Sequence, residues 1–202
     1  MKNILPVLLF LIIGYSTNAV FAQDEALTKG TETPAFKTKT DTTQCFVFNQ
    51  YVVKTASGED VGENISVYKR AGSTNANAGC KAKNALLFTI KNPDANYFIG
   101  LAGNYLFIDS GTGADVRGLE IYNLTTRKSV FSGDYHDSVK LLQDRFVMFD
   151  KISAKKGILK NCKQAAEIKR NGSIPGWVQD TKLDLQTMKT TPVGALRCYA
   201  ME

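Results

Sequence analysis

The chain has little of the chemistry that metal sites and nucleophilic active sites need. Among its 202 residues it contains a single histidine, His136. Histidine-based metal sites use two or more imidazoles, so one chain cannot build such a site. Ser132 and Asp134 lie close to His136, but residues of one turn cannot hold a nucleophile, a base and an orienting acid in line. We therefore interpret His136 as a solvent-exposed turn residue.

Motifs for nucleotide and acyl chemistry are also missing. The sequence has no GxxxxGK[ST] phosphate loop, no GxGxxG at the start of a helix and no GxSxG nucleophile elbow. These motifs place backbone N–H groups around phosphates or expose a serine at the top of a sheet. Their absence favours a protein that is not an enzyme, and we expect no cofactor and no nucleic-acid partner.

Long apolar runs are missing as well. The longest run, Ile4 to Ile13, has about ten residues, whereas a membrane-spanning helix needs about 20. Lys2 precedes it, and Val20-Phe21-Ala22 follows a few residues later in the pattern of a peptidase cleavage site. We interpret residues 1–22 as a secretory signal peptide. The sequence thus predicts a secreted protein, in the bacterial periplasm, with no transmembrane segment after cleavage.

The four cysteines include no close pair. They lie at least 35 residues apart, whereas zinc sites use close pairs such as CxxC. An even number of cysteines in an oxidising compartment favours two disulfides, for which three pairings are possible. Because smaller loops close more readily, we favour Cys45 with Cys80 and Cys162 with Cys198. This pairing leaves no free thiol for catalysis.

The composition divides the rest of the chain into two parts. Residues 23–43 are rich in Thr, Lys, Glu and Asp and have few apolar side chains, so we expect a flexible polar leader. Residues 44–202 are expected to form a single β-rich domain, because short runs rich in Val, Ile, Phe and Tyr recur between turn residues. The runs are 45–54, 65–69, 85–91, 96–101, 104–109, 118–124, 128–132, 145–152, 182–187 and 195–200.

These runs predict an all-β fold, either an antiparallel sandwich or a barrel-like meander. The clearest part is 97–133, where Ala102-Gly103-Asn104 separates two apolar runs as a hairpin turn would. We interpret this part as a four-strand meander. It looks like one blade of a β-propeller, but we find no second copy of its pattern, which a propeller needs.

One short helix is expected in the C-terminal half, over 158–170. Ile158, Cys162, Ala165 and Ile168 recur at helical spacing, and Asn171-Gly172 supplies a stop. The same stretch is strongly basic. Between Lys151 and Arg170 seven basic residues face one acidic residue, whereas the chain after Ala22 has 24 basic and 19 acidic residues in all. The positive charge of the protein is therefore local.

This basic segment predicts a binding module for anionic envelope components, a glycan or a lipid. The candidate ligand-binding residues are Lys155, Lys156, Lys160, Lys163 and Trp177. The alternatives are a solvated helix face for the lysines and a core position for Trp177, which follows a Pro-Gly turn. Inhibition of lysozyme fits the size and location of the protein but not its charge, because lysozymes are typically basic.

Phe107-Ile108-Asp109-Ser110-Gly111-Thr112 resembles the active-site signature of aspartic proteases. That resemblance implies Asp109 as a catalytic carboxylate in a loop after a strand. Because the chain holds one copy, catalysis would need a retropepsin-like homodimer with two carboxylates sharing a proton. An aspartic hydrolase is therefore the alternative function. The same residues also suit a polar hairpin loop.

Overall fold

The computed structural model describes residues 31–72, 75–92, 95–113, 116–154, 157 and 159–201, with nothing described for the side chain of residue 159. The signal peptide predicted for residues 1–22 lies outside this part. Strands make up 55% of the chain and helices 7%, so the all-β prediction is confirmed. In the described part, no helix is both long and apolar enough to cross a membrane.

The strands form three antiparallel sheets, which we call sheets A, B and C. Sheet A contains β1 (Phe36–Lys39), β2 (Thr43–Val47), β3 (Tyr51–Ser57), β4 (Glu63–Lys69) and β5 (Ala85–Ile90). Sheet B contains β6 (Asn96–Ala102), β7 (Tyr105–Ser110), β8 (Arg117–Asn123) and β9 (Lys128–Tyr135). Sheet C contains β10 (Val139–Leu142), β11 (Phe146–Ile152), β12 (Ile174–Asp184), β13 (Lys189–Pro192) and β14 (Arg197–Met201). The helical elements are α1 (Ala76–Gly79), the 3-10 turn η2 (Leu159–Asn161) and α2 (Ala165–Arg170).

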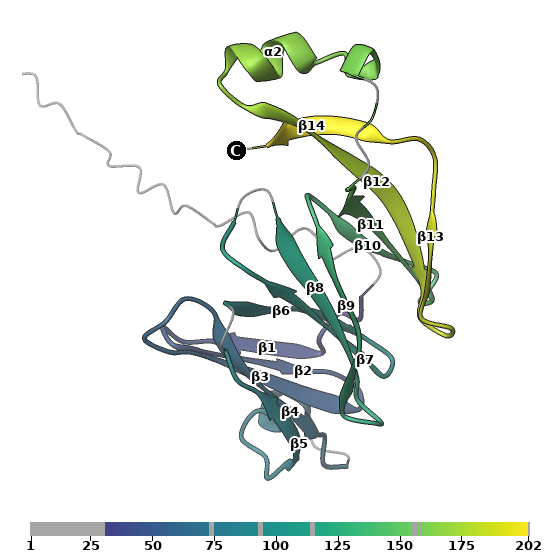
Figure 1. Ribbon diagram of the computed structural model, residues 1–202. Helices are drawn as coiled ribbons and strands as arrows, with labels where there is room; N and C mark the ends of the chain where they lie inside the picture. The colour runs from purple at the N-terminus through teal and green to yellow at the C-terminus, as the bar shows by residue number, and fades with distance from the viewer. Residues whose placement is uncertain are drawn as a thin grey trace, which may run out of the picture.

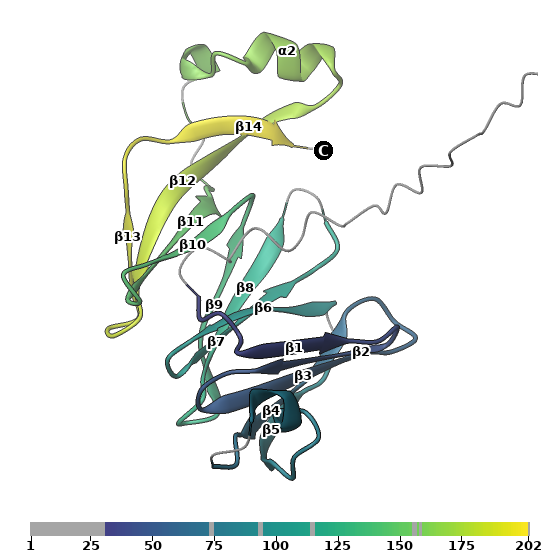
Figure 2. The same cartoon turned by 180° about the vertical axis from the view of Figure 1, so that it is seen from behind.

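Sheet B lies between the other two sheets, as the ribbon shows from both sides (Figures 1 and 2). Leu106 and Ile108 point to one side and pack in a cluster with residues of sheet A. Phe107 points to the other side and packs with residues of sheet C. All three are fully buried, which explains the continuous apolar run of β7 in place of the usual alternation.

The predicted four-strand meander is sheet B. Its strands pair in chain order, and Gly103 and Asn104 form the two-residue turn between β6 and β7. Gly103 has a φ of +55°, a left-handed conformation that glycine adopts without strain. Sheets A and C are also built mostly from consecutive hairpins. In sheet C the long strand β12 pairs with β11 on one side and with β13 and β14 on the other.

The prediction of a flexible leader over 23–43 is wrong for the described end of that segment. β1 pairs with β2, and Ala35 N–H donates to the carbonyl of Val47 at 2.7 Å. The side chains of β1 are mostly exposed, so composition gave no sign of a strand. Backbone hydrogen bonds to an existing sheet edge hold it instead.

Three other boundaries differ from the prediction. The run 45–54 is a hairpin, because the Phe48 N–H donates to the Tyr51 carbonyl and β2 and β3 pair. β12 begins at Ile174, so Pro175 lies inside a strand and not in a turn. Pro175 is tolerated there because β11 pairs with β12 only from Val178 onward, which leaves one side of the strand open. β10 and β13 have no counterpart in the predicted runs.

The helix predicted for 158–170 is only partly present. Residue 158 lies outside the described part, and η2 and α2 are separated by residues 162–164. Cys162 is bonded to Cys198 on β14, and its carbonyl accepts from Ala165 in a tight turn. The disulfide fixes this point against sheet C, and the helix starts again after it. The stop at Asn171 and Gly172 is confirmed, with Gly172 at a φ of +83°.

Candidate functional site

Both predicted disulfides are confirmed. Cys45 bonds Cys80, and Cys162 bonds Cys198, with sequence separations of 35 and 36. Among the described residues there is no free cysteine. Each bond attaches a connection that contains a short helix to one of the outer sheets. The second of these connections carries the predicted basic residues.

We call residues 159–173 the basic cap. It consists of η2 and α2 and lies beyond β12 and β14 at one end of the molecule (Figure 1). Its basic side chains are exposed, and only Glu167 opposes them. They are Lys160, Lys163, Lys169 and Arg170. Lys155 and Lys156, which precede the cap in the sequence, lie outside the described residues.

A small apolar cluster holds the cap on sheet C. Cys162 and Ile168 are buried against Trp177 of β12, with Ala165 and Leu196 at the edge of the cluster. Because the apolar side chains of the cap point inward, its charged side chains are left on the outer surface. The disulfide and this cluster together give a rigid support to a positively charged surface.

The interpretation of Trp177 as a ligand-binding residue is wrong, and the core alternative is correct. Its side chain is only 7% exposed. A Cβ added to Gly157 would lie 2.4 Å from the indole ring, so the backbone of Gly157 covers that ring. A ring covered in this way cannot stack on a sugar. In the sequence, only the glycine at position 157 indicates that the backbone lies this close to the ring of Trp177.

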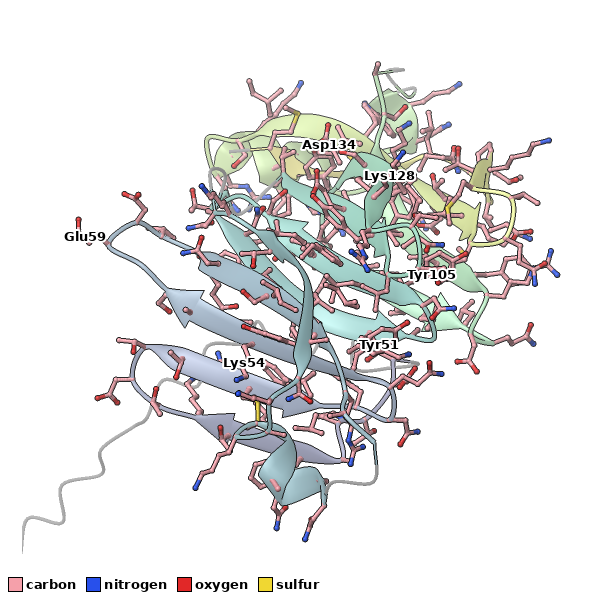
Figure 3. The ribbon with its side chains drawn as sticks, turned by 90° about the horizontal axis from the view of Figure 1, so that it is seen from below. Tyr51, Lys54, Glu59, Tyr105, Lys128 and Asp134 are labelled. Carbon is pink, nitrogen blue, oxygen red and sulfur yellow. A yellow bond between two sulfur atoms is a disulfide. The ribbon has the colours of Figure 1, made fainter. Side chains whose placement is uncertain are left out.

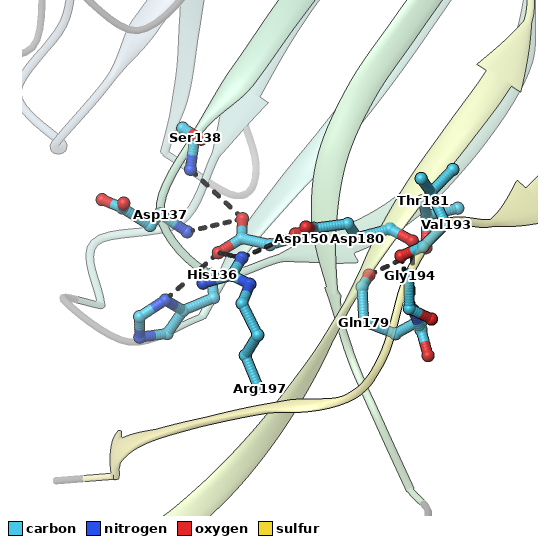
Figure 4. Close-up of polar contacts among 10 residues, drawn as sticks. All are labelled: His136, Asp137, Ser138, Asp150, Gln179, Asp180, Thr181, Val193, Gly194 and Arg197. Carbon is cyan, nitrogen blue, oxygen red and sulfur yellow. Dashed lines mark hydrogen bonds and ion pairs between the residues drawn. The ribbon is translucent and has the colours of Figure 1, made fainter. Parts of the chain in front are cut away.

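A polar network, which the sequence did not reveal, lies beneath β14 (Figure 4). Asp150 of β11 is 5% exposed, and its Oδ1 accepts from the backbone N–H groups of Asp137 and Ser138 at 3.0 and 3.2 Å. The Nδ1 of His136 lies 3.5 Å from its Oδ2. The imidazole also contacts the ring of Tyr199 on β14, with centroids 4.0 Å apart. His136 does lie in the connection between β9 and β10, as predicted, but its side chain is only 21% exposed, so the prediction of a solvent-exposed residue is wrong.

Arg197 extends this network to the start of β14. Its guanidinium donates to Asp180 at 2.6 Å and lies 3.9 Å from Asp150. The hydrogen bond to Asp180 raises the pKa of Arg197, and the charge of Asp150 raises it further. Arg197 immediately precedes Cys198. The network therefore fixes the strand to which the cap is bonded.

Asp109 does not lie in a loop, as the aspartic protease resemblance requires. It lies inside β7 and is 6% exposed. Its carboxylate accepts from Arg117 Nε at 2.7 Å, from a second nitrogen of Arg117 and from the Tyr135 hydroxyl at 2.9 Å. The bond to Asp109 raises the pKa of Arg117, and burial raises the pKa of Tyr135. Asp109 is thus occupied by an ion pair within one chain, and the structure does not support an aspartic hydrolase.

Comparisons with known proteins give no further assignment. No protein-family model matches the chain. No curated protein and no solved structure matches it either. Within the described residues, no group of three His, Cys, Asp or Glu side chains could hold a metal ion.

Proposed function

We propose that the protein is an exported binding module whose basic cap binds an anionic glycan or lipid of the bacterial cell envelope. The two disulfides are compatible with a protein that works outside the cytoplasm. The predicted signal peptide supports export, and we propose the periplasm as the location. The proposal includes no catalytic step.

One observation carries this proposal: four exposed basic side chains gather in the short segment of the cap, and none of them forms an ion pair within the described residues, whereas three arginines elsewhere do. Arg117, Arg145 and Arg197 each form an ion pair with an aspartate. Within the described part of the chain, the four basic side chains of the cap form no ion pair. Their charge is therefore available to a ligand, and their support is fixed by the disulfide and the Trp177 cluster. A preordered cluster of like charges attracts a polyanion at little conformational cost.

The test is binding to vesicles of phosphatidylcholine with and without phosphatidylglycerol, and to an immobilised anionic polysaccharide. The test variant replaces the four basic residues of the cap, Lys160, Lys163, Lys169 and Arg170, by Gln. Each lysine or arginine near an anionic surface contributes about 1 kcal/mol, so we expect roughly a thousandfold weaker binding to the anionic vesicles. Binding of the wild type should also weaken as salt rises.

A matched control removes the same number of charges from the other end of the molecule. It replaces the exposed Lys39, Lys81, Lys83 and Lys91 by Gln. If the cap is the binding site, this control keeps most of its affinity. Equal losses in both variants would show that net charge alone attracts the ligand, and unchanged binding of the cap variant would overturn the proposal. The vesicle and polysaccharide arms distinguish a lipid from a glycan.

A further inference from the structure

The end of β12 that lies away from the cap borders a different kind of surface. β12 has 11 residues, which at about 3.3 Å per residue separate its two ends by roughly 33 Å. At the far end, the hydroxyl of Tyr105 donates to the carbonyl of Leu185, just after β12, at 2.8 Å. Hairpin turns of all three sheets meet here. Tyr51 and Tyr105, from sheets A and B, lie at the same side of the molecule in Figure 3.

Two adjoining cavities lie between these turns, and we call them together the hairpin cleft. One has a volume of about 270 Å³ and the other about 430 Å³. Both are lined by Glu32 and Gly103, so they meet at these residues. Tyr51 of sheet A lines the first, and Asp144, in the turn before β11, lines the second. Ligand sites have volumes of this order and often lie where structural units meet.

Hydrogen bonds hold the side chains of Asn104, Asn123 and Glu32 in place in the cleft. Asn104 Oδ1 accepts from the Tyr51 hydroxyl at 2.8 Å, and Asn123 Oδ1 accepts from two backbone N–H groups of its own turn. Glu32 Oε1 accepts from Gly103 N–H at 2.7 Å. Within the described residues, the Nδ2 groups of both asparagines and the carboxylate of Asp144 make no hydrogen bond. The cleft therefore presents two asparagine donors of fixed orientation and, at Asp144, a carboxylate acceptor.

Tyr51 and Tyr105 add to this arrangement. Burial raises the pKa of Tyr51, and the negative charge of Glu32 raises it further. Its hydroxyl therefore stays protonated and keeps the amide of Asn104 oriented. The hydroxyl of Tyr105 donates to the carbonyl of Leu185, and Tyr105 is among the residues that line the larger cavity. An aromatic ring beside amide donors and carboxylate acceptors matches a molecule with apolar C–H faces and many hydroxyl groups.

We propose that the hairpin cleft binds a neutral saccharide. No lysine or arginine is among the described residues that line either cavity, so an anionic ligand would meet two carboxylates without a counter-charge. A sugar satisfies both the asparagine donors and the carboxylate acceptors without bringing a charge of its own. This site is separate from the basic cap, and its ligand class is different.

The experiment measures binding of the full exported chain to an array of neutral and amino oligosaccharides. It is carried out in about 1 M salt, where the Debye length of about 3 Å suppresses binding through the cap. The test variants are Gly103→Asn and Asp144→Ala. Gly103 has a φ of +55°, which asparagine tolerates, and a Cβ there would meet no atom within 4 Å. The first variant thus adds a side chain at a residue that lines both cavities, without crowding the fold.

Gly194→Asn is the matched control, because Gly194 has a φ of +71° and is equally open. We expect a neutral sugar to be retained at millimolar concentrations by the wild type and by the control. Asp144→Ala should bind it about tenfold more weakly, as for the loss of one good hydrogen bond. Gly103→Asn should also bind it about tenfold more weakly, because the added side chain competes with the sugar for space. Retention of no neutral sugar, retention of amino sugars alone, or equal binding by Gly103→Asn would each overturn the assignment. The variant of the basic cap that has four basic residues replaced by Gln should bind the sugar normally. Failure of one proposal would therefore leave the other intact.

Discussion

The two disulfides close loops of nearly equal length but hold very different parts of the molecule. Cys45 and Cys80 pack with Val47 and Val52 on sheet A, whose other face shares a large core with sheet B. Cys162 belongs to a small cluster with Ile168 and Trp177, apart from the two large cores. The Cys45–Cys80 disulfide thus reinforces a connection that already has many contacts. The Cys162–Cys198 disulfide supplies much of what fixes the cap.

The largest expected effect comes from removing each disulfide in turn, as Cys45→Ser with Cys80→Ser and as Cys162→Ser with Cys198→Ser. The separations of 35 and 36 give the same loop-closure entropy, so each pair should cost up to about 4 kcal/mol of unfolding free energy. Amide hydrogen exchange should differ between them. Loss of Cys162–Cys198 should expose the amides of α2, while loss of Cys45–Cys80 should leave the amides of β3 protected.

Urea unfolding and exchange measured on the same samples check this prediction. The wild type with its disulfides intact is the reference for both. Equal exchange of α2 and β3 in the two variants would mean that the cap has support beyond the disulfide and the Trp177 cluster. In that case the contrast between the two regions would be lost.

A smaller effect is expected from the glycines that let each helical connection approach its sheet. A Cβ at Gly79 would lie 2.8 Å from Val47 Cγ1, and one at Gly157 would lie 2.4 Å from the ring of Trp177. Gly79→Ala gains helix propensity, which offsets part of the crowding in α1. Gly157→Ala has no such gain and should cost about 1 to 3 kcal/mol. Urea unfolding measures the loss of unfolding free energy in both variants. Gly58→Ala is the control, because a Cβ at Gly58 has space.

If Gly79→Ala lowers the unfolding free energy as much as Gly157→Ala does, the two contacts are equally tight. The proposed difference between the regions would then rest on the disulfides alone. A lower affinity of Gly157→Ala for anionic vesicles would link the position of Trp177 to the function of the cap.

The smallest effect is expected at the end of sheet C that has no disulfide. There Arg145 bonds Asp184 through two nitrogens, at 3.2 and 2.7 Å. The hydrogen bond from Arg145, assisted by the backbone N–H of Gln186, lowers the pKa of Asp184 from 3.8 to about 2. Because the folded pKa is the lower one, this stabilisation is present above pH 3.8 and is lost as the pH falls through about 2.

Asp184→Asn removes this dependence. The melting temperature of the wild type should therefore fall slightly more steeply than that of the variant as the pH drops from 3.8 to 2. The difference should be small, because the pair lies at the surface, with 43% of the Arg145 side chain exposed, and is screened by water. Parallel curves would show that this ion pair makes no measurable contribution to the stability of that end of sheet C.

Much of this fold could be predicted where a local pattern decides the structure. The pairing of Cys162 with Cys198 followed from loop length, and the turn at Gly103 followed from its residue type between two apolar runs. β1 could not be predicted, because its exposed side chains carry no pattern and its backbone partner is set by the tertiary structure. β12 was missed at its start because Pro175 normally marks a turn, and one open side of the strand overrides that preference.

The sites divide in the same way. The exposure of Lys160 and Lys163 agrees with the sequence analysis, because charged side chains avoid the interior. The burial of Trp177 and the contact of His136 with Asp150 depend on residues far apart in the chain. The hairpin cleft depends on turns from three sheets. A single sequence contains no local sign of such a meeting.

The ion pair at Asp109 has a consequence for how β7 finds its alignment. In a strand with one solvent-exposed face, alternating apolar and polar residues set the register with the neighbouring strands. In β7, however, Leu106, Phe107 and Ile108 are all apolar and all buried. A slip of β7 by one residue would exchange one large apolar side chain for another at little cost. It would also move Asp109 away from Arg117 and leave a charge stranded in the interior. Asp109, the one acidic residue of β7, thus favours the observed alignment of β7 in sheet B over the alignment shifted by one residue.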